Sequence, residues 1–209
     1  MVVTSPYGSV DVPEVSLTEL ILGQAAGYGE RPALVDGPSG RTITYEQLVK
    51  GAGAVAAGLQ ARGFSKGDVF AIFLPNLPEY ALVFQGVALA GGINTTINPL
   101  YTAEELAFQL NDSKAKFLVT IPQFLDRAIE AKEKSGVEEL FVLGEGEGAT
   151  PFTEVMGTSA PAQVEIDPRN DLVVLPYSSG TTGLPKGVML THHNLVANIL
   201  QAEQCQLVG

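Results

Sequence analysis

The chain has 209 residues, of which 23 are acidic and 12 are basic, and its formal net charge is −11 at pH 7. This charge argues against a general electrostatic attraction to nucleic acid or to anionic lipid, so an anionic ligand needs a local site. Because 45% of the residues are hydrophobic and 17% are charged, the chain can form a packed core, which argues against disorder.

Both termini and the cysteine content indicate a cytoplasmic protein. The N-terminal stretch MVVTSPYGSVDVPEVS lacks the basic and apolar regions of a secretory signal, and no window reaches the length of a membrane span. The C-terminal QCQLVG carries no lipidation or address signal. Cys205 is the only cysteine, so no intrachain disulfide can form, which fits a reducing compartment. We therefore expect a soluble cytoplasmic protein without a transmembrane segment.

Helices are expected after an irregular lead-in at residues 1–15. The sequence S-L-T-E from Ser16 is typical of a capping box, in which the serine hydroxyl and the glutamate carboxylate each bond to a backbone amide. The sequence T-Y-E-Q from Thr44 repeats this pattern, and apolar residues continue at helical spacing until Gly63, a candidate C-terminal cap. The sequence T-A-E-E from Thr102 likewise caps a later helix. The first helix is short and the second is long.

From residue 69 onward, apolar runs and helical patterns alternate. The run VFAIFL at 69–74 is continuously apolar, as in a strand buried on both faces. The expected strands are 69–74, 93–98, 116–120, 139–143 and 172–177, with helices at 78–89, 102–111 and 122–134 between them and another at 194–205, after a short strand in GVMLTH. Such an alternation predicts an α/β fold with right-handed crossovers and a mostly parallel, doubly wound sheet. The chain ends at Gly209 without a closing element, which is typical of truncation.

The segment YSSGTTGLPKGVML (177–190) carries the most informative pattern. Its first serine begins a run of six Ser, Gly and Thr residues, which offers main-chain amides and four hydroxyls in one loop. Successive amides can bind an anion, glycines allow a close backbone approach, and Lys186 adds a positive charge three positions further on. A flexible turn would explain the glycines but not this whole combination, so the pattern favours a phosphate-binding loop.

A Walker A loop is excluded by the two residues that flank the lysine. Pro185 stands where that motif needs glycine and has no amide hydrogen to donate. Gly187 stands where the motif needs Ser or Thr, and it has no hydroxyl for a magnesium ion. The phosphate site is therefore of another kind.

The longer segment YSSGTTGLPKGVMLTHHNL resembles the phosphate-binding signature of the adenylate-forming (ANL) enzymes. This superfamily includes acyl-CoA synthetases, 4-coumarate–CoA ligases, firefly luciferase and peptide-synthetase adenylation domains. Residues 74–120 resemble an earlier block of the family, and TYEQL at 44–48 resembles its opening helix. The resemblance covers nearly the whole chain in family order, and LPYSSGTTGLPKGVMLTH is most similar to 4-coumarate–CoA ligases and related acyl-CoA ligases.

This resemblance implies a two-step reaction. A carboxylate attacks the α-phosphate of Mg-ATP to give an acyl adenylate and pyrophosphate, and coenzyme A then displaces AMP to form a thioester. The residues that match the positions holding the ATP phosphates are Ser178, Ser179, Gly180, Thr181, Thr182 and Lys186. ATP, Mg²⁺, coenzyme A and a carboxylic acid are thus the implied ligands of the full-length enzyme.

The resemblance also implies that residues 16–209 are an incomplete piece of the large N-terminal AMP-binding domain. The later subdomains, the C-terminal lid and the catalytic residues would lie in further sequence, so we expect no catalytic residue in this chain and no activity from it alone. No metal site is expected either, since the adjacent histidines His192 and His193 point in different directions. A surface position or a role at a helix N-terminus is expected for them instead.

Other functions stay open at this point. The parent enzyme could be an amino-acid adenylation domain or a luciferase-like oxidase, and its acid could be aromatic, fatty or of another kind. In a different class, the chain could be a non-catalytic fragment that binds nucleotide or self-associates through exposed apolar surface.

Overall fold

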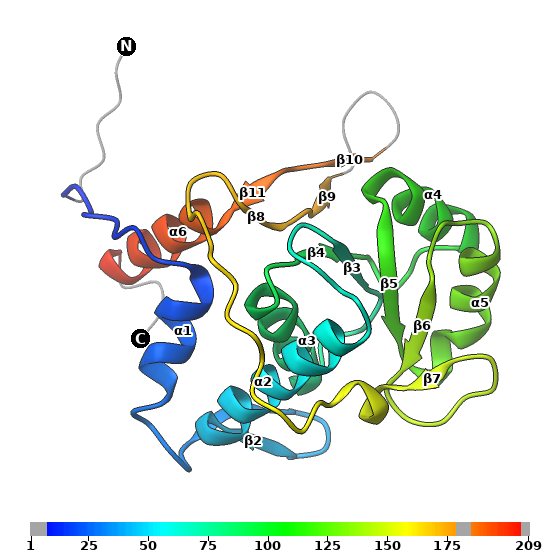
Figure 1. Cartoon of the computed structure of the whole chain (residues 1–209), viewed down its shortest axis with the longest axis horizontal. Helices are drawn as coiled ribbons and strands as arrows, with labels where there is room; N and C mark the ends of the chain where they lie inside the picture. The colour runs from blue at the N-terminus through cyan, green and yellow to red at the C-terminus, as the bar shows by residue number, and fades with distance from the viewer. Residues whose placement is uncertain (1–7, 179–184, 206–209) are drawn as a thin grey trace.

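The computed structural model describes residues 8–178 and 185–205, and its centre is a seven-stranded sheet with the order β11-β8-β4-β3-β5-β6-β7 (Figure 1). All neighbouring strands in it pair in parallel except β11, which is antiparallel to β8. The strands are β3 (Val69–Ile72), β4 (Ile93–Thr96), β5 (Ala115–Thr120), β6 (Glu139–Val142), β7 (Thr150–Pro151), β8 (Leu172–Val174) and β11 (Leu190–Thr191). The predicted α/β fold with a mostly parallel, doubly wound sheet is confirmed.

The strand order reverses direction at β3. From β3 the chain crosses to β4 on one side and then returns to β5 on the other side. In open α/β sheets, ligands bind outside the carboxyl ends of the strands at such a switch point. The fold therefore directs attention to the segments that follow β3 and β5.

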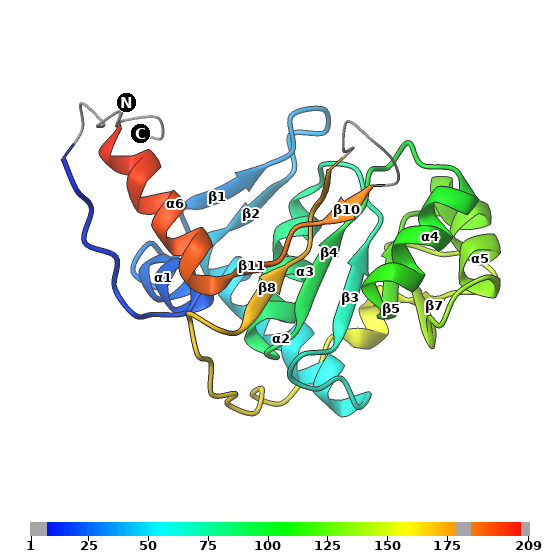
Figure 2. The ribbon, with the colours of Figure 1, turned by 90° about the horizontal axis from the view of Figure 1, so that it is seen from above.

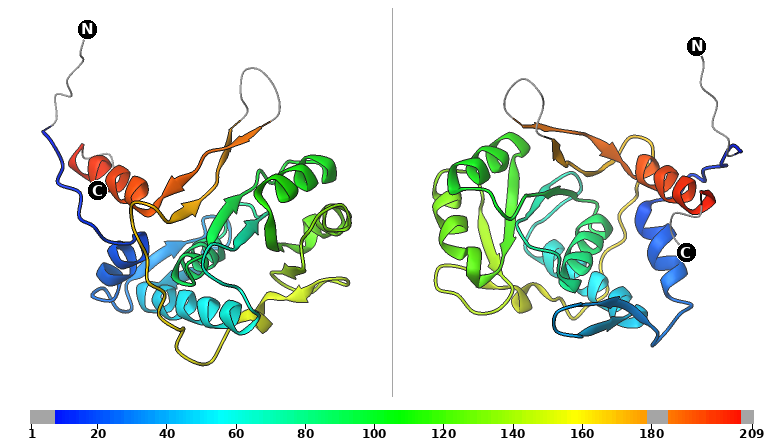
Figure 3. Two further views of the ribbon diagram at one scale, coloured as in Figure 1. Left: turned by 45° about the horizontal axis from the view of Figure 1, so that its top comes forward. Right: turned by 180° about the vertical axis from the view of Figure 1, so that it is seen from behind.

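Helices cover both faces of the sheet (Figures 1 and 3). Alternate side chains of β3 point to opposite faces, so Phe70 packs with α2 (Tyr45–Ala61) and α3 (Pro78–Leu89), whereas Ala71 packs with α4 (Ala103–Ser113) and α5 (Leu125–Glu133). Both faces are thus buried, which is the reason for the continuous apolar runs in the sequence.

Two further helices lie together at one end of the molecule, beside β8 and β11 (Figure 2). They are α1 (Leu17–Ala25) and α6 (His192–Gln204), and their apolar side chains share a cluster with Val173 of β8. No helix within residues 8–178 and 185–205 has both the length and the apolar character needed to cross a bilayer.

Two of the predicted capping boxes are complete, and the one at Ser16 is half formed. At Thr44 both reciprocal bonds are present, and the same is true at Thr102. At Ser16 the hydroxyl accepts from the Glu19 amide at 3.1 Å, which is one half of the box. Thr191 caps α6 with Asn194 as its partner, so this helix begins two residues earlier than its predicted start at 194.

Several elements were not predicted. A separate two-stranded hairpin consists of β1 (Pro32–Val35) and β2 (Thr42–Thr44), and short 3₁₀ helices lie at η1 (Pro122–Phe124) and η2 (Phe152–Val155). The predicted strand 172–177 is two strands, β8 and β9 (Tyr177–Ser178), separated at Pro176. Proline has no amide hydrogen for a strand ladder, which explains the interruption.

Candidate functional site

The two described ends of the predicted phosphate loop form a short antiparallel ribbon, which we call the β9–β10 ribbon. It consists of β9 and β10 (Lys186–Gly187), in which Ser178 lies opposite Lys186 and Tyr177 lies opposite Gly187. Directly opposite residues of an antiparallel pair present their side chains on the same face. The Ser178 hydroxyl and the Lys186 ammonium are both exposed and so lie on one accessible face.

The structure thus brings together two of the six predicted phosphate-binding residues. The other four lie outside the described residues: Ser179, Gly180, Thr181 and Thr182. Hydroxyl and ammonium donors on one face suit a phosphate, because charge-assisted hydrogen bonds to an anion are stronger than neutral ones.

Backbone and side-chain hydrogen bonds hold the segment that leads into the ribbon. The Leu175 amide donates to the Asn94 carbonyl at 2.7 Å, and the Thr95 hydroxyl donates to the Leu175 carbonyl at 3.1 Å. On the far side, the Val188 amide donates to the Pro176 carbonyl at 2.8 Å. The ribbon therefore continues from β8, beside the carboxyl end of β4.

A side-chain hydrogen bond ties the ribbon to α4. The Tyr177 hydroxyl donates to Asp112 Oδ2 at 2.6 Å. Burial, together with the hydrogen bond to Asp112, holds the pKa of Tyr177 above its usual value, so the hydroxyl keeps the proton that it donates. Sequence reasoning missed this pair because 65 positions separate the two residues.

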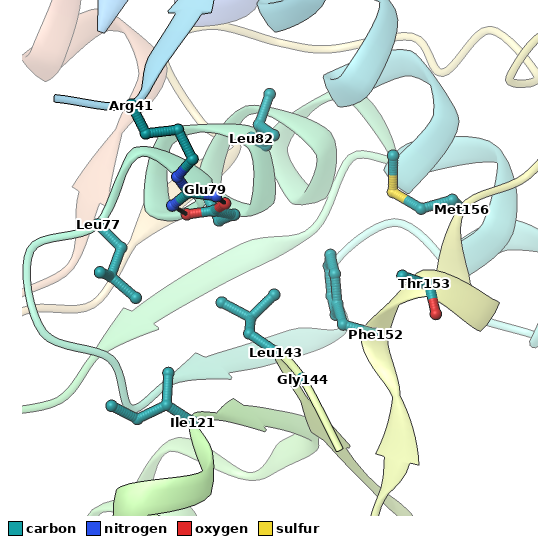
Figure 4. A pocket seen from close by; sticks show the side chains of 10 residues that line it. All are labelled: Arg41, Leu77, Glu79, Leu82, Ile121, Leu143, Gly144, Phe152, Thr153 and Met156. Carbon is teal, nitrogen blue, oxygen red and sulfur yellow. Dashed lines mark hydrogen bonds and ion pairs between the residues drawn. The ribbon is translucent and has the colours of Figure 1, made fainter. Parts of the chain in front are cut away.

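An apolar pocket lies at the topological switch point, with a cavity volume of about 450 Å³ (Figure 4). Its walls come from segments that directly follow β5 and β6, from the loop after β3 and the start of α3, and from η2 and the turn of the β1–β2 hairpin. The lining residues are Arg41, Leu77, Glu79, Leu82, Ile121, Leu143, Gly144, Phe152, Thr153 and Met156. The sequence assigned no residue of this pocket to a ligand.

The charged groups in this pocket bind each other. Both guanidinium nitrogens of Arg41 donate to the Glu79 carboxylate, with Nη2 2.8 Å from Oε2. The hydrogen bond to Glu79 raises the pKa of Arg41. The carboxylate and the guanidinium group thus bind each other, and most of the other side chains that line the pocket are apolar.

Of the two histidines, His192 has a structural role in the core. Its side chain is fully buried, and its Nδ1 accepts a hydrogen bond from the Leu17 amide at 3.1 Å. Burial lowers the pKa of His192 to about 4, so the imidazole is a neutral acceptor. The expected helix N-terminal role is confirmed, whereas a surface position is wrong for this residue. In the part of the chain that the structure describes, no three His, Cys, Asp or Glu side chains gather in a metal-binding group.

The sequence as a whole matches the family described as AMP-binding enzyme over residues 22–208. The chain belongs to this family. Among curated relatives it is 39% identical over 188 residues to 4-coumarate–CoA ligase 3 of Oryza sativa subsp. japonica, an alignment that covers 90% of this chain and 34% of the relative. It is 41% identical over 180 residues to 4-coumarate–CoA ligase CCL1 of Humulus lupulus, with 83% and 32% covered. The chain thus spans about a third of the length of these relatives.

Solved structures of family members share its fold. A long-chain-fatty-acid–CoA ligase (FadD1) from Archaeoglobus fulgidus superposes with a TM-score of 0.89 at 31% identity, covering 99% of this chain and 42% of that protein. The anthranilate–CoA ligase AuaEII, solved with anthranoyl-AMP, gives a TM-score of 0.76 at 27% identity, covering 86% and 35%. These similarities confirm the adenylate-forming acyl-CoA ligase family, to which the sequence pattern pointed.

Proposed function

We propose that this chain is part of an ATP-dependent carboxylate–CoA ligase. In the first step, a carboxylate oxygen attacks the α-phosphate of ATP, and the bond to pyrophosphate breaks. In the second step, the thiolate of coenzyme A attacks the acyl carbon, and AMP leaves. The 4-coumarate–CoA ligases among the curated relatives and the long-chain-fatty-acid–CoA ligase among the solved structures carry CoA ligase names, which supports this reaction class.

The β9–β10 ribbon carries the part of the reaction that we assign to this chain. Ser178 and Lys186, opposite one another and exposed, are suited to hold the phosphates of ATP. We assign the same role to Ser179, Gly180, Thr181 and Thr182 from their position in the motif. Such groups position the polyphosphate and offset the charge that develops on the departing pyrophosphate, which lowers the barrier without covalent participation of the protein.

We expect magnesium to enter with ATP, bound to its phosphates. The donors on the described ribbon are a hydroxyl and an ammonium group, and these fit phosphate oxygens better than a divalent cation, which prefers oxygen ligands with negative charge. Coenzyme A is the second cosubstrate. The lone Cys205 supports the expected cytoplasmic location, since a reducing compartment suits such a chain.

For the acid substrate we place 4-coumarate-like aromatic acids first, since 4-coumarate–CoA ligases are prominent among the curated relatives. Fatty acids are the second candidate because a long-chain-fatty-acid–CoA ligase shares the fold over 99% of the chain. Assay of the full-length protein by acyl-hydroxamate trapping, with both classes of acid, decides between them.

We expect the 209-residue chain to bind ATP without forming acyl-CoA, because the family resemblance places the catalytic residues in later sequence. Calorimetric titration of the chain with ATP, with and without magnesium, tests the binding. Binding of ATP together with hydroxamate formation by the full-length protein supports the proposal. Acyl-CoA formation by the chain alone refutes the assignment of catalysis to later sequence, and the absence of ATP binding refutes the assigned role of the ribbon.

A further inference from the structure

The β9–β10 ribbon is too short to hold its own geometry. It contains two residue pairs, Ser178 with Lys186 and Tyr177 with Gly187. A two-stranded ribbon in water is at best marginally stable even when it is longer than this. Contacts with the rest of the fold must therefore keep Ser178 and Lys186 opposite each other.

Helix α4 supplies a fixed support for the ribbon. A complete capping box holds its N-terminus, and Leu106 and Leu110 bury its apolar face in the core. One turn of this helix makes two contacts that support the ribbon. Gln109 donates through Nε2 to the Thr95 hydroxyl at 2.9 Å, and this hydroxyl in turn donates to the Leu175 carbonyl.

The second contact is made by Asp112, three positions after Gln109 and so on the same side of α4. Its Oδ2 accepts the hydrogen bond from the Tyr177 hydroxyl at 2.6 Å, a length typical of a hydroxyl that donates to a carboxylate. Tyr177 directly precedes Ser178 in β9. The hydrogen bond therefore acts on the ribbon one residue away from the proposed phosphate contact.

Gly187 provides the space that this arrangement requires. A Cβ atom there would lie 3.1 Å from both Cε2 and Cζ of Tyr177 and 3.3 Å from its hydroxyl oxygen. The Tyr177 ring thus lies against the glycine across the ribbon. The same glycine that excludes a Walker A loop makes room for the tyrosine, because any side chain would move the ring and its hydroxyl away from Asp112.

On the basis of the phosphate-binding function above, we propose that Tyr177 and Asp112 are positioning residues for this site. Their hydrogen bond fixes the base of the β9–β10 ribbon to α4 and keeps the Ser178 hydroxyl and the Lys186 ammonium directed to the same phosphate. Neither residue touches the phosphate. Gly187 is part of the same arrangement, because the tyrosine ring packs against it.

The first test needs no ligand. Trypsin cleaves after Lys186 when the ribbon opens, and mass spectrometry measures the rate of this cleavage relative to cleavage after Lys50, an exposed lysine of α2. Tyr177→Phe and Asp112→Ala should each raise the relative rate roughly three- to ten-fold, the change expected for the loss of one hydrogen bond. Asp112→Asn should restore most of the protection, since its amide oxygen can still accept from the hydroxyl.

The matched control for Tyr177→Phe is Tyr45→Phe, which removes a hydroxyl from α2, where the ring packs on Tyr28. This variant should cleave like the wild type. Equal cleavage after Lys186 in Tyr177→Phe, Asp112→Ala and the wild type would overturn the proposal. An equal acceleration at Lys50 would also overturn it, because the hydrogen bond would then stabilise the whole fold rather than the ribbon.

The second test measures binding of inorganic triphosphate by calorimetry. Tyr177→Phe and Asp112→Ala should weaken the affinity by a factor of roughly three to ten, and Asp112→Asn by less. If the variants open faster but bind triphosphate as the wild type does, the positioning role is wrong. If the wild type itself binds no triphosphate, the proposed function fails for this chain, while the cleavage rates still decide whether the hydrogen bond holds the ribbon.

Discussion

Ser178 and Lys186 occupy directly opposite positions in the β9–β10 ribbon, although seven residues lie between them in the sequence. Both side chains are exposed, so their donors are free to bind an anion from solvent. This relationship links the sequence motif to a defined place in the fold, beside the carboxyl end of β4.

Lys186→Ala should weaken the affinity of the chain for ATP by about ten-fold or more. The loss of a charged partner to phosphate removes about 1.5–3 kcal/mol of binding free energy. Calorimetric titration with Mg-ATP measures the change. Lys50→Ala is the control, because Lys50 is an exposed lysine that pairs with Glu46 within α2, and its replacement should leave the affinity unchanged. Equal affinities of Lys186→Ala and the wild type would contradict the assigned role.

The buried His192 should make the stability of the fold depend on pH. Its folded-state pKa of about 4 lies below the ordinary value of 6.5, so the unfolded chain takes up a proton first as the pH falls. The stabilisation is therefore fully present above pH 6.5 and is lost as the pH falls toward 4. Its full size is on the order of 3 kcal/mol. The nearby charged groups, Asp171 and Lys66, form an ion pair with an Nζ–Oδ2 distance of 2.6 Å, and they act on the imidazole with opposite sign.

Urea unfolding at several pH values between 7 and about 4.5 measures this dependence. Linear extrapolation to zero denaturant gives the free energy of unfolding at each pH. His192→Asn keeps an acceptor for the Leu17 amide without a titrating group, so its free energy of unfolding should change less over this interval. His193→Asn is the matched control and should retain the wild-type slope. A wild-type slope in His192→Asn would show that another group causes the dependence.

Two glycines of α2 should respond in opposite directions to alanine. A Cβ at Gly58 would lie 1.4 Å from the Val155 carbonyl oxygen in η2, so Gly58→Ala must push η2 away from the helix. We expect it to lower the free energy of unfolding by roughly 3 kcal/mol or more. At Gly53 the nearest atom is Pro161 Cδ at 4.0 Å, so Gly53→Ala should instead stabilise the helix by about 0.5–1 kcal/mol. Chemical denaturation measures both, and a stable Gly58→Ala would contradict the close contact.

The chain should self-associate through apolar side chains that the fold leaves exposed. Val188 and Met189, between β10 and β11, are 44% and 69% exposed. Met189→Lys should therefore lower the apparent mass that light scattering records at high protein concentration. Leu100→Lys, in the loop before α4, is the control for a single exposed apolar residue elsewhere. A monomeric wild type at high concentration would contradict this prediction.

The pattern of apolar residues and caps predicted most of the fold. Continuous apolar runs such as 69–74 indicate strands with both faces covered, and the structure has a parallel sheet between two layers of helices. The capping boxes at Thr44 and Thr102 mark the observed helix starts. These signals are local, since a strand's alternation or a helix's cap depends on residues within a few positions.

The site was predicted only as a motif. The run of small and hydroxylated residues before Lys186 indicated a phosphate loop, and the family membership supports that reading. The sequence could not show that Tyr177 bonds to Asp112, or that Arg41 and Glu79 meet in the pocket at the switch point. Each pair joins elements whose relative placement follows from the packing of the sheet.

What the sequence determined by itself is the class of fold, the family and the segment that we propose to bind phosphate, because short-range patterns encode them. Only the tertiary structure decided which side chain supports that segment and that a buried imidazole joins α6 to the start of α1, 175 positions earlier. The physical reason is that a hydrogen bond between distant residues exists only after hydrophobic packing has brought their helices and strands to within about 3 Å of one another.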